Sequence, residues 1–562
     1  MNKKNKRRDL TALLLAITVV ILLNVVNSFV FHRFDLTSEK RYTLAPATKA
    51  LLAKLDEVVY VKVYLDGDFP AGFKRLRNET REMLDEFRTY SHDNIEYEFI
   101  NPSENPDKKQ QNELFKQLYD KGLQPFNVED KTDEGSTQQV IWPGAIVSYH
   151  GREAPWKLLK TSMGYSAEGQ LNNSVQALEY EFASCIHSLT TETHNEVGFI
   201  EGQGELDTLA VDDIKNALGE FYTLKRVKIN GQLNALKDLT TIVIAKPDTA
   251  FSEQDKFVID QFVMKGGKIL WCVDPLETRV DSLFTGRTYG VAYDLKLDDM
   301  LFKYGVRLNQ NMILDLQSSA LPVNTAFHGQ TPRVELRPWV YVPVILPTIN
   351  HPIVKNLDVI KFDYVSSIDL VDAGPGVKKT VLLATSKNSK LLNAPVRVDM
   401  ARMRMQEDES KFRAGPQPVA VLLEGQFESL YKNRLPPSIS GSKDIGFTDH
   451  SVTTKMIVIS DGDILRNDIQ GSSGKPYPLG YDKYTKQQFG NKNFILNCIN
   501  YLCDDSGLIS VRSRELTLRL LDNKKVKDDK LKWQLINTLI PLGLVLLYGF
   551  IHFIRRRRKY AN

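Results

Sequence analysis

The fold is decided by the stretch 244–275, which reads IAKPDTAFSEQDKFVIDQFVMKGGKILWCVDP. Short apolar runs at 241–245 and 268–273 flank an amphipathic helical pattern over 252–264. Continuous apolar strands that alternate with helices are typical of a parallel sheet covered on both faces. We therefore predict an α/β fold around this stretch.

The same alternation continues on both sides of it. We expect further strands at 197–200, 419–423 and 456–459, and further helices at 209–218 and 491–502. Between them lies a stretch with more strands and turns, interpreted as an insertion in the α/β body or a continuation of it. The predicted domain spans 191–510, with the insertion near 280–395.

A second α/β domain is predicted over 40–190. Its expected strands and helices, in the order βαβαββα, are 58–65, 73–87, 95–100, 106–118, 139–149, 156–161 and 172–189. This is the element order of a thioredoxin-like domain, an analogy at the level of the fold alone. The chain contains no Cys-x-x-Cys motif, so redox chemistry has no residues to carry it. We interpret the domain as a scaffold.

Two hydrophobic segments frame these domains. Residues 10–31 read LTALLLAITVVILLNVVNSFVF, and residues 533–554 read WQLINTLIPLGLVLLYGFIHFI. Each is uncharged and long enough to cross a bilayer. Five of the first eight residues are basic, and RRRRK follows the second segment. The positive-inside rule predicts two transmembrane helices, with both ends in the cytoplasm and the domains between them in the periplasm.

The remaining segments follow from this topology. Residues 1–9 and 555–562 are the predicted cytoplasmic basic tails, and 511–532 a juxtamembrane linker. A cleaved signal peptide is the alternative for the first segment, but its apolar run exceeds a signal h-region and no A-x-A site follows. Small and polar residues suited to helix packing in lipid are Asn24, Asn27, Ser28, Asn537, Thr538 and Gly543.

Composition narrows the class of protein. The chain has 562 residues, of which 42% are hydrophobic and 25% charged, as in folded domains. Its four cysteines form neither a disulfide framework nor a zinc ribbon pattern. The net charge is +4, but the basic residues crowd at the two ends and leave the middle acidic. Nucleic acid is therefore not the expected partner.

Four acidic residues follow predicted strands at their carboxyl ends: Glu205, Asp274, Asp461 and Asp463. In open α/β sheets ligands bind at this edge, so these residues are candidate ligand contacts. The simpler interpretation, which we favour, is that they cap helices and form turns. We assign no catalytic role to them.

Motifs for catalysis and for cofactors are missing from the sequence. Gly474-Lys475 is followed by Pro476 and does not make a nucleotide-binding loop. Cys272 lies inside an apolar strand without flanking glycines, which indicates a buried thiol rather than a nucleophile. The nine histidines show no metal-binding spacing. We predict neither catalytic residues nor a metal or cofactor.

Several stretches carry a resemblance to a known family. They are FDLTSEKRYTL after the first hydrophobic segment, FIEGQGELD at 199–207, the stretch 244–275, IVISDGDIL at 457–465 and the hydrophobic tail. Together they resemble the auxiliary component of gliding-motility-type ABC transporters. The resemblance implies a partner permease in the bacterial inner membrane, a cytoplasmic ATPase bound through that permease, an unknown substrate, and an arrangement with two copies per transporter.

The resemblance also bears on fold and chemistry. It implies an α/β domain similar to one of an intraflagellar-transport protein and distantly related to class I glutamine amidotransferase-like folds. Where many relatives have Gly-His-Gly-Glu, this chain has Gly202-Gln203-Gly204-Glu205, so no catalytic histidine stands there. We expect a non-catalytic, membrane-anchored binding or coupling subunit. The alternatives are an extracytoplasmic amidotransferase-like or hydrolase-like enzyme and a free-standing cell-envelope scaffold.

Overall fold

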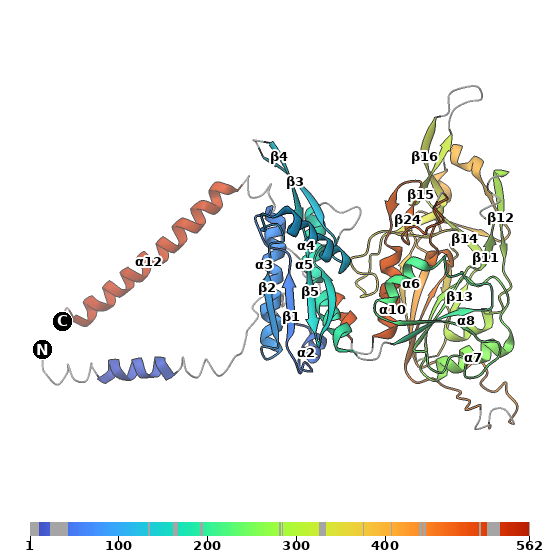
Figure 1. The fold of residues 1–562 in the computed structure, drawn as a ribbon, viewed down its shortest axis with the longest axis horizontal. Helices are drawn as coiled ribbons and strands as arrows, with labels where there is room; N and C mark the ends of the chain where they lie inside the picture. Colours follow the sequence, from blue (N-terminus) through green and yellow to red (C-terminus); the bar gives the residue numbers. More distant parts are fainter. Residues whose placement is uncertain are drawn as a thin grey trace. The chain divides into compact units, whose positions relative to one another are not determined.

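The computed structural model describes residues 11–22, 43–132, 135–160, 167–191, 195–279, 283, 285–324, 333–374, 376–405, 407–437, 441, 445–471, 473–504, 507–513 and 529–560. The chain divides into two units, Met1–Arg514 and Glu515–Asn562. The first unit holds an amino-terminal domain and a larger α/β domain, each built around its own sheet (Figure 1).

The amino-terminal domain contains the predicted helices and strands, but the single strand expected at 139–149 is divided between two strands and the structure adds a further one. Its elements are α2 (Pro46–Leu52), β1 (Val59–Val63), α3 (Ala71–Tyr90), β2 (Ile95–Phe99), α4 (Lys108–Asp120), β3 (Phe126–Thr132), β4 (Gly135–Ile141), β5 (Gly144–Tyr149), β6 (Arg152–Lys157) and α5 (Ala167–Thr190). The described sheet has the order β2-β1-β5-β6, in which β1 runs parallel to β2 and antiparallel to β5. The β3–β4 hairpin was not predicted.

Aromatic side chains form the core between this sheet and helices α3 and α5. Phe87 of α3 and Phe182 of α5 are buried, with their ring centroids 4.8 Å apart, and Trp156 of β6 stacks on Phe182 at 4.5 Å. Leu76 and Leu84 lie on the same buried face of α3 as Phe87. This apolar spacing on an otherwise charged helix is what made α3 predictable.

The last segment of the first unit returns to the amino-terminal domain. The 3-10 helix η5 (Leu508–Ser513) packs against α2 and α5. Leu508 belongs to the domain's core, and Ile509 and Val511 are buried with Ala45 and Tyr180. The predicted linker was wrong at its start, because residues 511–513 belong to this helix. Residues 514–528 lie outside the described residues.

The larger domain contains a seven-stranded sheet in the described part of the chain, with the order β19-β22-β23-β10-β9-β7-β8. Its elements are β7 (Glu196–Glu201), α6 (Asp212–Gly219), β8 (Thr223–Lys228), β9 (Thr241–Ala245), α7 (Glu253–Met264), β10 (Lys268–Cys272), β19 (Val377–Ala384), β22 (Pro418–Gly425), β23 (Thr454–Ile459) and α10 (Asn491–Cys503). The strand–helix–strand unit predicted from the opening stretch is confirmed.

Strand direction in this sheet differs from the prediction at one end. The strands from β8 to β23 run parallel, with Leu270 of β10 beside Val243 of β9 and Ile457 of β23. However, β22 is antiparallel to β23, and β19 to β22. The apolar run of β22 indicates burial on both faces but carries no information about direction, so the wholly parallel sheet was a wrong expectation.

Helices cover both faces of the sheet. On one face α10 and α6 pack against side chains such as Leu270 and Cys272, and on the other α7 and α8 (Asp298–Tyr304) pack against Trp271. Ser252 begins α7, since its side chain accepts a hydrogen bond from the backbone N–H of Asp255 at 3.1 Å. The continuous apolar strands are thus explained by burial on both faces.

The region predicted as an insertion near 280–395, together with the residues that flank it, is rich in short strands, although β19 within it belongs to the large sheet. They are β11 (Leu276–Thr278), β12 (Arg287–Ala292), β13 (Val306–Leu308), β14 (Asn311–Asp315), β15 (Ser318–Asn324), β16 (Val334–Ile345), β17 (Ile360–Lys361), β18 (Ile368–Leu370), β20 (Ser389–Asn393) and β21 (Val396–Asp399), followed by η2 (Met400–Arg404) and η3 (Glu409–Lys411). Trp339 and Tyr341 of β16 lie in its own apolar core.

Short elements complete the domain between β23 and α10. They are η4 (Asp463–Leu465), β24 (Tyr481–Asp482) and β25 (Gln487–Gln488). The backbone N–H of Asn467, after η4, donates to the carbonyl oxygen of Ala210 at 2.7 Å.

The second unit contains α12 (Lys530–Tyr560), and its stretch Lys532–Arg558 is long and apolar enough to span a membrane. Asn537, Thr538 and Gly543 lie on it, and the hydroxyl of Thr538 donates to the carbonyl oxygen of Gln534 at 2.7 Å. Of the other predicted span only Thr11–Leu22 is described, as a shorter apolar helix.

Part of the predicted membrane anchoring cannot be compared with this structure. Asn24, Asn27 and Ser28, and the rest of the first predicted span after residue 22, lie outside the described residues. The crossing at 533–554 is thus supported by a helix, whereas the two-span topology stays a prediction.

Candidate functional site at the carboxyl edge of the sheet

Three of the four predicted acidic residues meet at one edge of the large sheet. Asp274 follows β10, and Asp461 and Asp463 follow β23, which is the neighbour of β10. They gather around Lys246, which comes directly after β9 on the other side of β10. The ammonium nitrogen of Lys246 lies 3.2 Å from Asp274 Oδ2 and also forms an ion pair with Asp463. Parallel neighbouring strands place these residues together, as the edge rule predicts.

Backbone contacts hold Lys246 in this position. Its φ is 55°, in the left-handed region, and its N–H donates to the carbonyl oxygen of Cys272 at 2.8 Å. Gly462 passes so close that an added Cβ would lie 2.6 Å from Cβ of Lys246. The N–H of Gly462 donates to Asp274 Oδ1 at 2.5 Å. Glycine is needed here because the two backbone segments touch.

Asp461 has a structural role within the cluster. It is 1% exposed, and its carboxylate accepts hydrogen bonds from the backbone N–H of Asp363 at 2.7 Å and of Asp463 at 2.8 Å. Burial, with Asp274 close by, raises the pKa of Asp461 well above its ordinary value. This residue forms the turn that the simpler interpretation expected and ties the strand-rich region to the sheet.

A second partly buried lysine lies beside the first cluster. Lys361 of β17 has its ammonium nitrogen 3.1 Å from Asp482 Oδ2 and 3.7 Å from Asp363 Oδ1. Asp482 also accepts from the backbone N–H groups of Tyr484 and Thr485, both at 2.9 Å. Although burial opposes it, the pairing with Lys361 and these N–H groups keeps the pKa of Asp482 below its ordinary value.

The charges in this region shift one another's pKa values. Burial raises the pKa of Asp274 to about 6, although Lys246 opposes that shift, and burial also raises the pKa of Asp363. Burial by itself would lower the pKa of Lys246, but Asp274 and Asp463 outweigh it and raise that pKa. Both lysines therefore stay charged, and the protons of the site are exchanged by the carboxyl groups.

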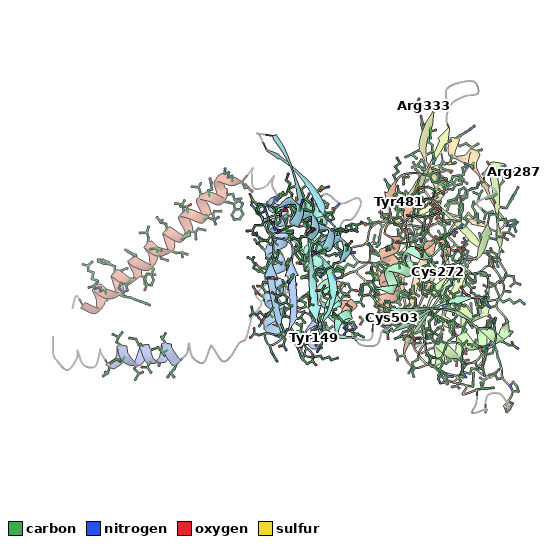
Figure 2. All side chains as sticks on the ribbon, viewed as in Figure 1. Tyr149, Cys272, Arg287, Arg333, Tyr481 and Cys503 are labelled. Atoms are coloured by element: carbon green, nitrogen blue, oxygen red, sulfur yellow. The ribbon has the colours of Figure 1, made fainter. Side chains whose placement is uncertain are left out.

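These groups form one wall of a cavity of about 900 Å³. The cavity lies where the strand ends, the strand-rich region and the segment before α10 meet. Its other walls include Leu276, Thr278, Tyr293, Ser319, Leu321, Trp339, Val342, Tyr364, Met400, Tyr481 and Tyr484. Tyr481 and Cys272 of β10 are labelled in Figure 2 as landmarks of the region. The volume suits a small-molecule ligand or a short segment of a larger one.

Glu205, the fourth predicted residue, takes no part in this cluster or in the cavity lining. Its carboxylate accepts the backbone N–H of Gln203 at 2.8 Å, and burial raises its pKa. Gly204 has φ 73°, and an added Cβ would overlap the carboxylate of Asp248. The side chain of Gln203 donates to Asp255 at 3.1 Å. Residues 202–205 therefore form a packed structural turn.

Several residues of the site were not predicted. Lys246 carries a usable signal, because it is a charged residue placed directly after an apolar strand. Lys361, Asp363 and Asp482 carry none, since they come from short strands and loops far apart in the sequence. Only the folded arrangement of the insertion brings them to the edge of the sheet.

The cysteines are confirmed as buried thiols. Cys272 is 0% exposed, and burial raises its pKa well above the ordinary value. Cys498 lies in the same core, and Cys503 Sγ lies 3.3 Å from the hydroxyl of Thr241. Among the described residues, no group of three or more His, Cys, Asp or Glu side chains is arranged to hold a metal ion.

Comparison with known proteins places the larger domain in a family. Residues 194–498, more than half of the chain, match the family described as "ABC-type uncharacterized transport system". The chain belongs to this ABC transport family. Residues 38–148 match a domain of unknown function, DUF7088. Membership in the ABC transport family supports an auxiliary, non-catalytic role and association with an ABC transporter.

Individual relatives add little about function. An uncharacterized protein of Borreliella burgdorferi is 20% identical over 565 residues, covering 99% of each chain. A solved structure of the mmIFT52 N-terminal domain shares 12% sequence identity and covers 55% of this chain and 99% of that chain, with a TM-score of 0.31. That likeness is too weak to assign the fold of the ABC transport family member.

Proposed function

We propose that this member of the ABC transport family is a non-catalytic auxiliary subunit whose cavity at the carboxyl edge of the sheet binds a ligand outside the membrane. The observation that carries the proposal is the convergence of Lys246, Asp274 and Asp463 on a cavity of about 900 Å³. Ion pairs whose side chains are largely shielded from solvent contribute little to stability, because removing each charge from water costs free energy. A binding role explains why they are kept at the edge where ligands enter α/β sheets.

The proposal includes a place in the cell envelope. We place the chain in the bacterial inner membrane as a two-pass protein with both termini in the cytoplasm and its domains in the periplasm. It pairs with a permease and, through that permease, with a cytoplasmic ATPase. The helix α12 with Arg555–Arg558 at its end supports the carboxyl-terminal anchor. The sequence resemblance supports a gliding-motility transporter of the GldG type found in Bacteroidota.

Fold-level features fit this role. The order β2-β1-β5-β6, with its parallel and antiparallel pairs, supports a thioredoxin-like scaffold for the amino-terminal domain. The parallel part of the large sheet supports a distant relation to amidotransferase-like folds. Amidotransferase chemistry needs a reactive thiolate at a strand end, whereas Cys272 is buried inside β10 with a raised pKa. We therefore favour binding and coupling over catalysis.

Isolation of the complex tests the proposal. We expect a tagged full-length chain, extracted from native membranes in mild detergent, to bring down a permease and an ATPase. Replacing 533–554 by a Leu/Ala helix of equal length, with Arg555–Arg558 kept, is expected to weaken this association. Substitution of Glu113, exposed on α4, by alanine is the control and should leave it unchanged. Recovery of the chain without any permease would favour the scaffold alternative.

Topology needs a separate measurement. A reporter that is active only in the periplasm should work when inserted at Gly471 and fail when fused after Asn562. Activity of the carboxyl-terminal fusion would contradict the two-pass arrangement.

A further inference from the structure

The charged residues around the cavity are matched to one another. Among the described residues that line it, five are cationic and six acidic. Each takes part in at least one ion pair within the wall: Lys246 with Asp274 and Asp463, Lys361 with Asp363 and Asp482, Arg279 with Glu277, Arg466 with Asp463, and Lys483 with Asp468. The charges of the wall are therefore largely matched within the protein, with one carboxyl group in excess.

Protonation of a carboxyl group in the wall brings the net charge of the wall closer to zero. The six carboxyl groups exceed the five cations by one, and the pKa of Asp274 is raised to about 6 while that of Asp363 is also raised. A ligand with a net charge would bring an unmatched charge into a partly buried site. Such a charge costs several kcal/mol, on the order of the penalty for an unpaired buried ion. A neutral ligand avoids that penalty.

The wall nevertheless offers many hydrogen-bonding groups. Carboxylate oxygens accept more than one hydrogen bond, and each lysine ammonium has three N–H groups to donate. Tyr293, Tyr481 and Tyr484 add phenol groups along the wall. A ligand that can both donate and accept several hydrogen bonds fits this surface.

Aromatic and apolar side chains complete the site. Tyr484 is 47% exposed, and the ammonium nitrogen of Lys483 lies 5.2 Å from the centroid of its ring. Tyr481 stacks on Tyr477 with ring centroids 4.9 Å apart, and Leu276 and Val342 form an apolar part of the wall. Flat C–H faces of a ligand can pack on such side chains while its hydroxyl groups face the carboxylates and lysines.

We infer that the cavity binds a neutral, hydroxyl-rich ligand of the carbohydrate class. This inference rests on the proposed function, namely that the cavity is a ligand site, and it adds the chemical class of the ligand. Hydroxyl groups of one sugar ring would donate to Asp363 and Asp463 and accept from Lys361 and Lys246, and the ring's C–H face would pack on Tyr484. No covalent step is involved.

The test compares probes of equal length and different charge. Full-length protein in detergent is titrated calorimetrically at pH 6.0 with maltotetraose and N-acetylchitotetraose, which are neutral, with chitotetraose, which is cationic at this pH, and with tetragalacturonate, which is anionic. We expect a neutral probe to bind at least about tenfold more tightly than either charged one. Tighter binding of a charged probe, or no binding of any neutral probe, would overturn the inference.

Variants of the wall sharpen the test. Asp363→Asn removes one acidic charge and should shift the preference toward tetragalacturonate, whereas Lys361→Met should shift it toward chitotetraose. Tyr484→Ala should weaken the binding of the neutral probe about threefold or more, as expected for loss of one aromatic contact. Tyr119→Ala, at an exposed position of α4 that is not part of the cavity lining, is the matched control and should not change binding. Thermal unfolding of each variant shows that it is folded.

The outcomes separate this inference from the proposed function. If a doubly blocked tetra-alanine peptide or a charged probe binds instead of the sugars, the ligand site stands and the ligand class is wrong. If none of these probes binds and no permease is recovered with the chain, the proposed function fails as well.

Discussion

Two carboxylates of the same domain, each largely shielded from solvent, differ in their surroundings. Asp260 of α7 is 0% exposed and accepts hydrogen bonds from Ser429 Oγ at 2.6 Å, the N–H of Leu430 at 2.9 Å and the hydroxyl of Tyr304 at 2.9 Å. These three donors are neutral groups of the protein. Asp274 instead faces Lys246 beside the cavity.

This difference distinguishes a carboxylate that serves the structure alone from one that lies where a ligand could contact it. Around Asp260 the fold supplies the donors, and Gln261 adds a fourth at 3.0 Å. The negative charge of Asp274 is instead balanced by Lys246, which also pairs with Asp463. The adjacent cavity leaves room for another molecule. Burial raises the pKa of both carboxyl groups, so a shifted pKa by itself does not tell the two kinds of site apart.

The largest effect on stability is expected for Asp260→Ala. The change leaves the buried donors on Ser429, Leu430 and Tyr304 without their acceptor, and each costs about 1–3 kcal/mol. We expect a loss of roughly 4 kcal/mol in the free energy of unfolding, measured by denaturant titration. Glu113→Ala, on an exposed part of α4, should change it by less than about 0.5 kcal/mol. A loss below about 1 kcal/mol for Asp260→Ala would mean that the comparison is wrong.

A smaller and pH-dependent effect is expected for Lys246→Met. Without the ammonium group, Asp274 loses its ion pair and Asp463 keeps only the one with Arg466, and we expect a loss of roughly 3 kcal/mol at pH 7.5. The loss should shrink toward pH 5, because the carboxyl groups then take up protons. Denaturant titrations at both pH values measure this, with Lys303→Met, whose partner Glu428 is less buried, as the control. A loss that does not depend on pH would contradict the charge-based account.

The third effect concerns the pH dependence due to Asp274. Its pKa is raised from 3.8 to about 6, so the folded state binds the proton more tightly than the unfolded state. The stabilisation by the protonated form is complete below pH 3.8 and is lost as the pH rises through 6. Asp274→Asn mimics the protonated form, so its stability relative to the unmodified chain should rise between pH 4 and 6 and stay at that higher level above pH 6.

Unfolding midpoints of both proteins across pH 4–7.5 check this third prediction. The control is Glu113→Ala, on the exposed side of α4, which should leave the unfolding midpoint unchanged at every pH of the series. A parallel pH profile of Asp274→Asn and the unmodified chain would show that Asp274 does not titrate in this range.

The smallest effect is expected for Glu205→Gln. The amide oxygen of glutamine can still accept the N–H of Gln203, and burial already disfavours the charged carboxylate. We expect less than about 0.5 kcal/mol change in the free energy of unfolding and unchanged binding of a neutral sugar probe. Loss of binding in this variant would place Glu205 in the site after all.

Features that depend on one short stretch of sequence were predicted correctly, whereas features that depend on how distant segments meet were not. Strands β9 and β10 and helix α7 were predicted because their apolar patterns and the Ser252 cap act within one short stretch. The meeting of Asp274 with Asp463 followed from a rule about parallel strands. Glu205 was grouped with them wrongly, because strand order is not encoded locally and β7 lies beyond β9.

The lysine pairings show the same limit. Lys361 reaches Asp482 only because β17 of the insertion and β24 near the carboxyl end are brought to one place. No pattern in the sequence around Lys361 or Asp482 indicates that the two residues pair. The antiparallel setting of β22 was missed for a related reason, since its direction depends on the path of a distant connection.

The return of η5 to the amino-terminal domain has a consequence for synthesis. Leu508 is part of that domain's core, and Ile509 and Val511 cover Ala45 and Tyr180. A ribosome makes the chain from its amino end, so this apolar surface on α2 and α5 stays uncovered until the whole larger domain has been made. Such surface on a nascent chain invites aggregation or chaperone binding. The amino-terminal domain is thus the first to be translated and among the last to be completed.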